Sequence, residues 1–232
     1  MLVLHYTGME SGAAARGRLC DASAEVSAHW LVHEDGTAEN LVAEENRAWH
    51  AGVGSWNGIT DVNSASIGIE IVNGGHDVRL ADGSLPPYPD AQILTVIKLA
   101  KDIIKRHDIK TRNIVGHSDI APDRKEDPGE HFPWSGLAAA GIGFWPGDLP
   151  DDIRIVFEAG DRDRGISIIQ RGLADLGYGA SVTGCLDAPT QAIIRAVQRR
   201  YRPARIDGVI DIPVMEIMKR LSEMIRASEV SV

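Results

Sequence analysis

Short apolar segments with the alternation of β-strands recur along the first half of the chain. Residues 2–7 begin with an apolar run that leads to His5, and residues 66–72 alternate with period two, which puts Glu70 on the face opposite to three isoleucines. Residues 114–117 form a shorter apolar run that ends in Gly116 and His117. Each pattern predicts a buried strand, and two of these strands end at a histidine.

A hairpin and one long helix complete the predicted first domain. Residues 26–32 and 38–43 flank an Asp-Gly pair, a strong signal for a tight turn between antiparallel strands. Residues 90–107 predict a helix with Asp90 as its N-cap. The apolar positions expected to face inward are Ile93, Leu94, Ile97, Ala100, Ile103 and Ile104. Together these elements predict an α/β fold with a mixed central β-sheet flanked by helices.

The last third of the chain has the pattern of three short amphipathic helices. The sequence Gly-x-x-Asp-x-Pro occurs at 184–189 and again at 208–213. Each copy supplies a turn, an N-capping Asp and a Pro for the first helical turn. We therefore expect a three-helix bundle whose inward positions are Ile166, Ile169, Leu173, Leu176, Ile193, Ile194, Val197, Tyr201, Val214, Ile217, Met218, Leu221 and Ile225.

These patterns divide the chain into a first domain (1–147), a linker (148–163), the helical bundle (164–226) and a tail (227–232). The linker contains Pro150 and is rich in acidic residues, with one apolar stretch that could dock as an extended segment. Since the bundle has its own apolar faces, we expect it to be separable from the first domain by a cut in the linker.

Composition and charge narrow the classes of partner. A chain of 232 residues that is 44% hydrophobic can bury a substantial core. The formal net charge of −9 argues against nucleic acid or an anionic membrane surface as a partner, and no apolar run is long enough to span a bilayer. No export signal precedes the first strand, so the sequence as given predicts a cytoplasmic protein, or a periplasmic one if an N-terminal segment is missing.

The cysteines and one histidine are expected to have structural roles. Cys20 and Cys185 fall in different predicted domains, so neither a disulfide framework nor a cysteine metal site is expected. We expect Cys20 to face inward beside Leu19 on a short helix. His29 lies inside a predicted strand, which favours a hydrogen-bonded structural histidine over a metal ligand.

Candidate chemistry gathers in residues 114–129. His117 follows a strand, Asp127 comes ten residues later, and Lys125 stands two positions before Asp127. Imidazole and carboxylate groups are both good zinc ligands, and a nearby ammonium can stabilise an anion that forms at the metal. A surface loop can carry the same residues without any metal. Glu70 is costly to bury unless it is paired, although it could also lie on the exposed face of an edge strand.

Five motifs in this order resemble the zinc-dependent N-acetylmuramoyl-L-alanine amidases of the amidase-2 family, the AmpD and AmiD group. The resemblance covers roughly the first 145 residues. The matching motifs are His5-Tyr6-Thr7, Val26-Ser27-Ala28-His29, Arg47-Ala48-Trp49-His50-Ala51-Gly52, Ser66-Ile67-Gly68-Ile69-Glu70, and residues 116–122 with 124–129.

The resemblance implies an enzyme that hydrolyses the amide between N-acetylmuramic acid, in its ordinary or 1,6-anhydro form, and L-alanine. It implies a zinc ion (Zn²⁺) on His5, His117 and Asp127. Glu70 would transfer the proton and Lys125 would stabilise the oxyanion. Trp49 and His50 would line the substrate cleft. The expected partners are peptidoglycan fragments (muropeptides) or murein.

The predicted bundle resembles the peptidoglycan-binding-1 module, through residues 173–178, 184–190, 196–201 and 207–211. Two other functions stay open at this point: a non-catalytic peptidoglycan-recognition protein, and a hydrolase of an unrelated amide. Loss of a metal ligand usually accompanies the non-catalytic case, whereas all three expected ligands are present. Within the amidase interpretation, the absence of a leader favours soluble anhydro-muropeptides, whereas the wall-binding module favours intact periplasmic murein.

Overall fold

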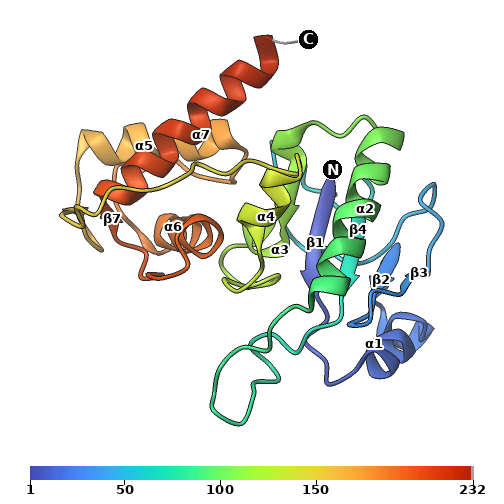
Figure 1. The fold of residues 1–232 in the computed structure, drawn as a ribbon. Coiled ribbons are helices and arrows are strands. Elements are labelled where there is room, and N and C mark those ends of the chain that lie inside the picture. The colour runs from blue at the N-terminus through green and yellow to red at the C-terminus, as the bar shows by residue number, and fades with distance from the viewer. Residues whose placement is uncertain (231–232) are drawn as a thin grey trace.

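The computed structural model describes residues 1–230 and contains a five-stranded sheet with a helical region beside it (Figure 1). The strand order is β3-β2-β4-β1-β5, with every neighbouring pair parallel except β2 and β3. The strands are β1 (Leu2–Tyr6), β2 (Trp30–Val32), β3 (Ala38–Asn40), β4 (Ile67–Ile71) and β5 (Ile114–Gly116). The sheet is mixed, as the sequence predicted.

Helices flank this sheet and form most of the C-terminal region. They are α1 (Gly12–Leu19), α2 (Asp90–Arg106), α3 (His117–Ile120), α4 (Trp134–Ala139), α5 (Arg164–Leu176), α6 (Ala188–Tyr201) and α7 (Ile212–Val230), with short 3-10 turns η1 (Ala22–Ala24) and η2 (Thr111–Asn113). No helix within residues 1–230 is both long and apolar enough to cross a membrane.

The register of the parallel strands brings the predicted site residues to one edge of the sheet. His5 on β1 pairs with Glu70 on β4. Leu4 pairs with Gly116 on β5, and His117 follows Gly116 directly. Because the carboxyl ends of parallel strands meet at the same edge, their terminal side chains converge there.

Helix α2 packs along one face of the sheet, with Val96, Ala100 and Ile103 in its core. The predicted inward position of Leu94 is wrong: this side chain is 57% exposed, because the inner face of α2 follows the positions of Val96 and Ala100. Asp90 is the first helical residue rather than the N-cap, since Pro89 holds the extended backbone before the helix.

The predicted strand over residues 26–32 is shorter than expected, because only Trp30–Val32 joins the sheet. The preceding residues bond to another loop instead: Ser27 N–H donates to the carbonyl of Trp49, and Trp49 N–H donates to Ser27 Oγ. The antiparallel β2–β3 hairpin is confirmed. His29 accepts from Gly68 N–H through Nδ1 and donates to the carbonyl of Asn46 through Nε2, which confirms its structural role.

Both cysteines are free thiols, as expected, but Cys20 is exposed rather than inward-facing. Cys20 caps the C-terminus of α1, where its backbone N–H bonds to the carbonyl of Arg16, and this position turns its side chain away from the core.

The C-terminal region forms the three predicted helices, and all thirteen of the side chains expected to face inward are buried. Asp187 caps α6 by accepting from Thr190 N–H, as the Gly-x-x-Asp-x-Pro motif predicted. Part of the segment expected to be a linker belongs to this region, because β6 (Ile155–Phe157) pairs antiparallel with β7 (Ile210–Asp211). Helix α7 continues into the expected tail as far as Val230; residues 231–232 lie outside the described part.

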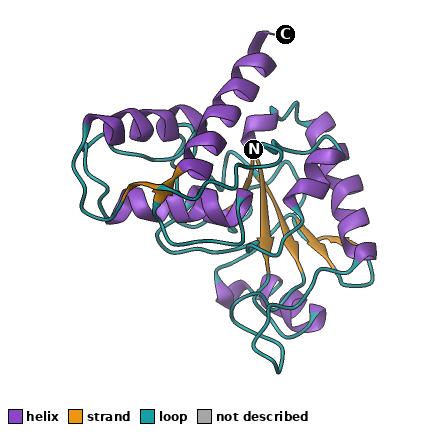
Figure 2. Cartoon of the chain, turned by 60° about the vertical axis from the view of Figure 1, so that its left-hand side comes forward, coloured by secondary structure: helices purple, strands orange, loops and turns teal. Residues whose placement is uncertain are grey.

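One hydrophobic core extends from the sheet into the helical region. Val3 and Val115 from the sheet belong to the same buried cluster as Ile194 and Val197 from α6. Helices α5, α6 and α7 lie together on one side of the sheet (Figure 2). The domain limits of the sequence analysis remain a prediction, but the packing joins the two regions through apolar side chains that a cut in the linker would expose.

Candidate active site

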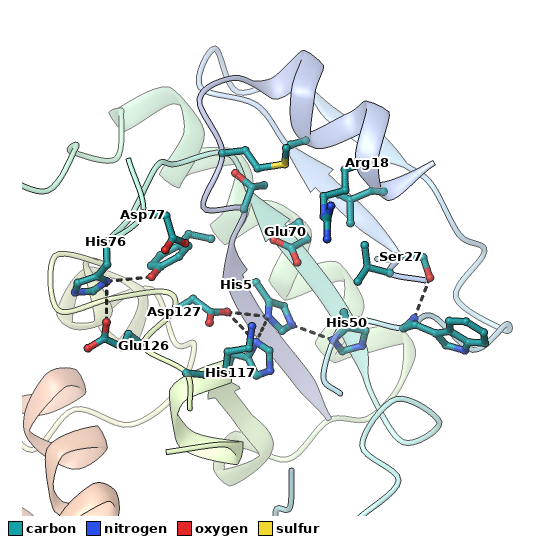
Figure 3. A pocket seen from close by; sticks show the side chains of 18 of the residues that line it. His5, Arg18, Ser27, His50, Glu70, His76, Asp77, His117, Glu126 and Asp127 are labelled. Carbon is teal, nitrogen blue, oxygen red and sulfur yellow. Dashed lines mark hydrogen bonds and ion pairs between the residues drawn. The ribbon is translucent and has the colours of Figure 1, made fainter. Parts of the chain in front are cut away.

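Two imidazoles and one carboxylate converge at the carboxyl edge of the sheet (Figure 3). His5 Nδ1, His117 Nδ1 and Asp127 Oδ2 lie 3.0 Å from one another in all three pairs. The residues come from β1, from the first position of α3 and from the loop after α3, and all three are buried. The structure therefore brings together the three ligands that the sequence predicted.

The segment from β5 to the loop is held in place by its own backbone. Ser118 N–H donates to the carbonyl of Asp127 at 2.9 Å, which closes the loop onto the start of α3. The Asp127–Pro128 peptide bond is cis. A Cβ added at Gly116 would lie 2.7 Å from Cδ of Pro128, so glycine lets the loop approach the strand this closely.

Hydrogen bonds behind the two histidines fix which ring nitrogen carries a proton. His117 Nε2 lies 2.9 Å from the carbonyl oxygen of Ala51, which can only accept, so Nε2 of His117 carries the proton. Its Nδ1 is then a free lone pair that points at Asp127 and His5.

A relay through His50 fixes His5 in the same way. Ser66 Oγ donates to the carbonyl of Val62 at 2.6 Å, and so it accepts from His50 Nε2 at 3.3 Å. His50 Nδ1 is then an acceptor for His5 Nε2–H at 2.9 Å. His5 Nδ1 is therefore also a lone pair. Partners of this kind behind a ligand histidine set its tautomer and orientation in metal sites.

Three acceptor atoms without a hydrogen between them repel one another unless a cation lies among them. Their 3.0 Å spacing is close to the edge of about 3.3 Å expected for a tetrahedral zinc site with bonds of about 2.0 Å. Burial lowers the pKa of His5 to about 4, against the opposing effect of Asp127. The donor set therefore suits a divalent metal.

Glu70 faces the same pocket from β4 (Figure 3). Within the described residues its Oε2 is buried and has no hydrogen-bond partner. Burial, and then the charge of Asp127, raises the pKa of Glu70 well above its ordinary value. A carboxylate with a raised pKa can accept a proton and later return it.

Lys125 lines the pocket, and its positive charge opposes the rise in the pKa of Glu70 and adds slightly to the lowering of the pKa of His5 by burial. The pocket has a volume of about 370 Å³. Trp49, at 49% exposed, lines the same pocket, and its contact with substrate stays a prediction. His50 also lines the pocket, but it is only 8% exposed and supports His5 from behind.

Several pocket residues were not singled out from the sequence. Tyr6 donates to His76 Nδ1 at 3.0 Å, and His76 Nε2 donates to Glu130. Arg124 donates to the carbonyls of Ala51 and Val53. Tyr6 and Arg124 lie inside motifs already recognised, so their place in those motifs could have marked them as pocket residues. His76 in its loop and Arg18 on α1 have no such signal.

Comparison with known proteins agrees with this geometry. The profile of the N-acetylmuramoyl-L-alanine amidase family matches residues 1–130, and that of a peptidoglycan binding domain matches residues 162–218. The chain belongs to the N-acetylmuramoyl-L-alanine amidase family. The sequence is 38% identical to the amidase AmiD of Escherichia coli over 233 aligned residues, which cover 96% of this chain and 82% of AmiD.

Two solved structures of this amidase family share the whole architecture. The complex of E. coli AmiD with the substrate anhydro-N-acetylmuramic acid-L-Ala-D-γ-Glu-L-Lys has a TM-score of 0.80 at 35% identity, covering 97% of this chain and 88% of that one. AmpDh3 of Pseudomonas aeruginosa, in complex with an anhydromuramic pentapeptide, has a TM-score of 0.79 at 34% identity and covers 97% and 91%. Both matches include the helical region as well as the sheet.

Proposed function

We propose that this amidase is zinc-dependent and cleaves the amide between 1,6-anhydro-N-acetylmuramic acid and L-alanine in muropeptides. The observation that carries the proposal is the convergence of three lone-pair acceptors beside Glu70, whose buried Oε2 has no hydrogen-bond partner among residues 1–230. His5, His117 and Asp127 would hold the metal. Bound zinc supplies Lewis acidity, which polarises the amide carbonyl and lowers the pKa of water in the site.

The side chains around this centre divide the rest of the reaction. Glu70 Oε2 accepts the proton of the attacking water and returns it to the leaving nitrogen of L-alanine, as its raised pKa favours. The Lys125 ammonium places positive charge beside the oxygen that becomes negative as the carbonyl is attacked. His50 and Ala51 keep the two ligand histidines in the tautomer that leaves Nδ1 free.

The choice of substrate rests on the relatives and on the charge of the pocket. Both solved relatives were captured with anhydromuramic peptides. Arg18 and Lys125 line the pocket and can face the carboxylates of a peptide stem. Turnover of intact murein is the second candidate, favoured by the match of residues 162–218 to a peptidoglycan binding domain. A cytoplasmic location remains a prediction, which fractionation of the native protein tests.

The test is metal analysis followed by turnover. Purified protein should contain one zinc per chain and should release L-alanyl peptide from a soluble anhydro-muropeptide, with the two products identified by mass spectrometry. Insoluble murein provides the competing substrate. Zinc without hydrolysis of either substrate would contradict the proposed reaction, and faster release from murein would select the second candidate.

A further inference from the structure

Two consecutive arginines in the last turn of α6 reach from the helical region to the segment that carries His117 and Asp127. Arg199 is 7% exposed and Arg200 is 5% exposed. Arginines are seldom buried this far without a specific partner. Each of them has an acidic partner on the sheet side of the interface.

Arg200 holds the turn from β5 into α3. Its Nη1 donates to Asp119 Oδ2 at 2.5 Å, and its Nη2 donates to the carbonyl of Ile114 at 3.0 Å. The guanidinium also stacks over the ring of Trp134, 4.0 Å from its centroid. The two acceptors, Asp119 and Ile114, stand on either side of His117 in the sequence.

Both carboxylate oxygens of Asp119 accept hydrogen bonds. It accepts from Gly116 N–H at 2.8 Å through Oδ2, and from the hydroxyl of Tyr178 at 2.7 Å through Oδ1. Tyr178 also belongs to the helical region, since it follows α5. The turn that presents His117 is therefore clamped from one side by its own backbone and from the other by two side chains of the helical region.

Arg199 reaches the loop that carries the other two functional residues. Its Nη2 donates to Glu126 Oε1 at 2.8 Å, and Glu126 stands between Lys125 and Asp127. Its Nε lies 3.6 Å from Glu130 Oε2, and Glu130 also accepts from His76 in the pocket wall. The carboxylate of Glu126 is half exposed, so this contact is the weaker of the two.

We propose that Arg199 and Arg200 are positioning residues for the metal centre, so that α6 of the peptidoglycan-binding region is part of the support of the active site. Arg200 fixes the orientation of His117 through Asp119, and Arg199 fixes the loop with Lys125 and Asp127. The inference rests on the proposed zinc site. It goes beyond wall binding, because it assigns the helical region a role in catalysis on soluble substrates too.

The residue that follows α6 offers a control for an effect on stability alone. Arg202 donates to Asp211 Oδ2 at 2.5 Å, and Asp211 is as buried as Asp119. Both partners of this pair lie within the helical region. Arg202 is the residue directly after α6, so Arg202→Met removes an ion pair to a buried aspartate close to Arg200, without touching the segment with His117. Arg205 Nη1 remains 3.4 Å from Asp211 Oδ2 in this variant.

The experiment compares Arg200→Met, Arg199→Met and Arg202→Met with the wild type in full-length protein. The main readout is the zinc dissociation constant from competition with a chelator, under conditions in which circular dichroism shows every variant to be folded. Outer partners of metal ligands typically change metal affinity about 10–100-fold. We expect a loss in that range for Arg200→Met, a loss of about threefold to tenfold for Arg199→Met, and none for Arg202→Met. Turnover of a soluble muropeptide should show lower kcat with little change in KM for the first two.

Conservative variants keep the proposal falsifiable if Arg200→Met does not fold. Arg200→Lys retains the charge on Asp119 and should recover part of the zinc affinity. Tyr178→Phe removes one donor from Asp119 and leaves the ion pair, and it should weaken zinc binding about threefold. Wild-type zinc affinity in Tyr178→Phe, or equal affinity in Arg200→Met and Arg202→Met, would overturn the positioning role. Absence of zinc from the wild type would instead overturn the proposed function itself.

Discussion

Two buried carboxylates, Asp119 within helix α3 and Asp127 in the loop after it, have opposite surroundings. Asp119 is 1% exposed and is faced by three donors, from Arg200, Tyr178 and the backbone of Gly116. Asp127 is 5% exposed and is faced at Oδ2 by the lone pairs of His5 and His117. Burial alone therefore does not distinguish a structural carboxylate from a functional one, whereas the supply of hydrogen-bond donors does.

The difference has an energetic consequence. A buried carboxylate with good donors offsets much of its desolvation cost within the protein itself. A cluster of acceptors cannot do so, and it needs a cation from outside. The Asp119 cluster should therefore hold the fold with or without metal, whereas the His5–His117–Asp127 cluster should gain stability only when the metal is bound.

The largest effect is expected from His117→Ala. The substitution removes one of three acceptors, so zinc should fall far below one per chain and the amidase rate should fall at least about 10⁴-fold, since the nucleophile and the carbonyl both depend on the metal. Metal analysis and a turnover assay measure the two. His107→Ala, at an exposed histidine that pairs with Glu44 and does not line the pocket, is the control. A full complement of zinc in His117→Ala would show that His117 is not a metal ligand. The surroundings of Asp127 would then no longer mark it as the functional carboxylate of the two.

A loss of roughly 10²–10⁴-fold in kcat is expected for Glu70→Gln, because the amide keeps the shape of the side chain but cannot take a proton. Zinc content should stay at the wild-type value, since Glu70 is outside the three acceptors. If Glu70→Gln turned over at the wild-type rate, another group would have to move the proton, and His50 would be the first to test.

Lys125→Ala should reduce kcat about 10²–10³-fold, in line with the loss of one donor to a developing oxyanion. Zinc should again be retained, although its affinity should rise slightly, because the ammonium repels a cation in the site. Lys125→Arg keeps the charge and should recover part of the rate. A variant that raised KM and left kcat unchanged would point to substrate binding instead.

The smallest effect concerns a third carboxylate, which has donors like those of Asp119 but lies at the surface. Glu44 accepts from Trp30, Arg106 and His107. Burial opposes its ionisation, but these donors lower its pKa to about 2. After allowance for solvent screening, Glu44→Gln should cost about 1 kcal/mol at pH 7.

The pH dependence of that cost follows from the sign of the shift. Since the pKa of Glu44 is depressed in the folded state, its contribution is present above the unfolded value of about 4.3 and is lost as the pH falls towards 2. Urea unfolding of wild type and Glu44→Gln at pH 7, 5 and 3 should show two stabilities that converge. If the difference in unfolding free energy between wild type and Glu44→Gln stayed constant down to pH 3, the charge of Glu44 would not contribute to stability.

Much of the fold and the three acceptors could be predicted from the sequence, because they depend on local pattern. An apolar run predicted β1 and alternation predicted β4, and the recognised motifs indicated His5, His117 and Asp127. The relay from Ser66 through His50 could not be predicted, since it depends on how side chains of separate loops and strands meet.

The burial of Arg199 and Arg200 could not be predicted from the sequence either. Two arginines in the last turn of a helix have the pattern of a solvated, dipole-stabilising end. Their acidic partners lie 73 and 81 positions earlier in the sequence, and nothing in α6 points to them. The shared core was missed for the same reason, because each apolar face was counted within its own predicted domain.

The strand order also determines when this active site can first form during synthesis. Strand β1 is an inner strand of the sheet, yet it leaves the ribosome before both of its neighbours: Leu2 pairs with Ile67 and with Ile114. The apolar side of Val3 is then covered by helices made last of all. An apolar strand must therefore wait, unpaired, while most of the chain is translated, which is the situation in which nascent chains aggregate or recruit chaperones.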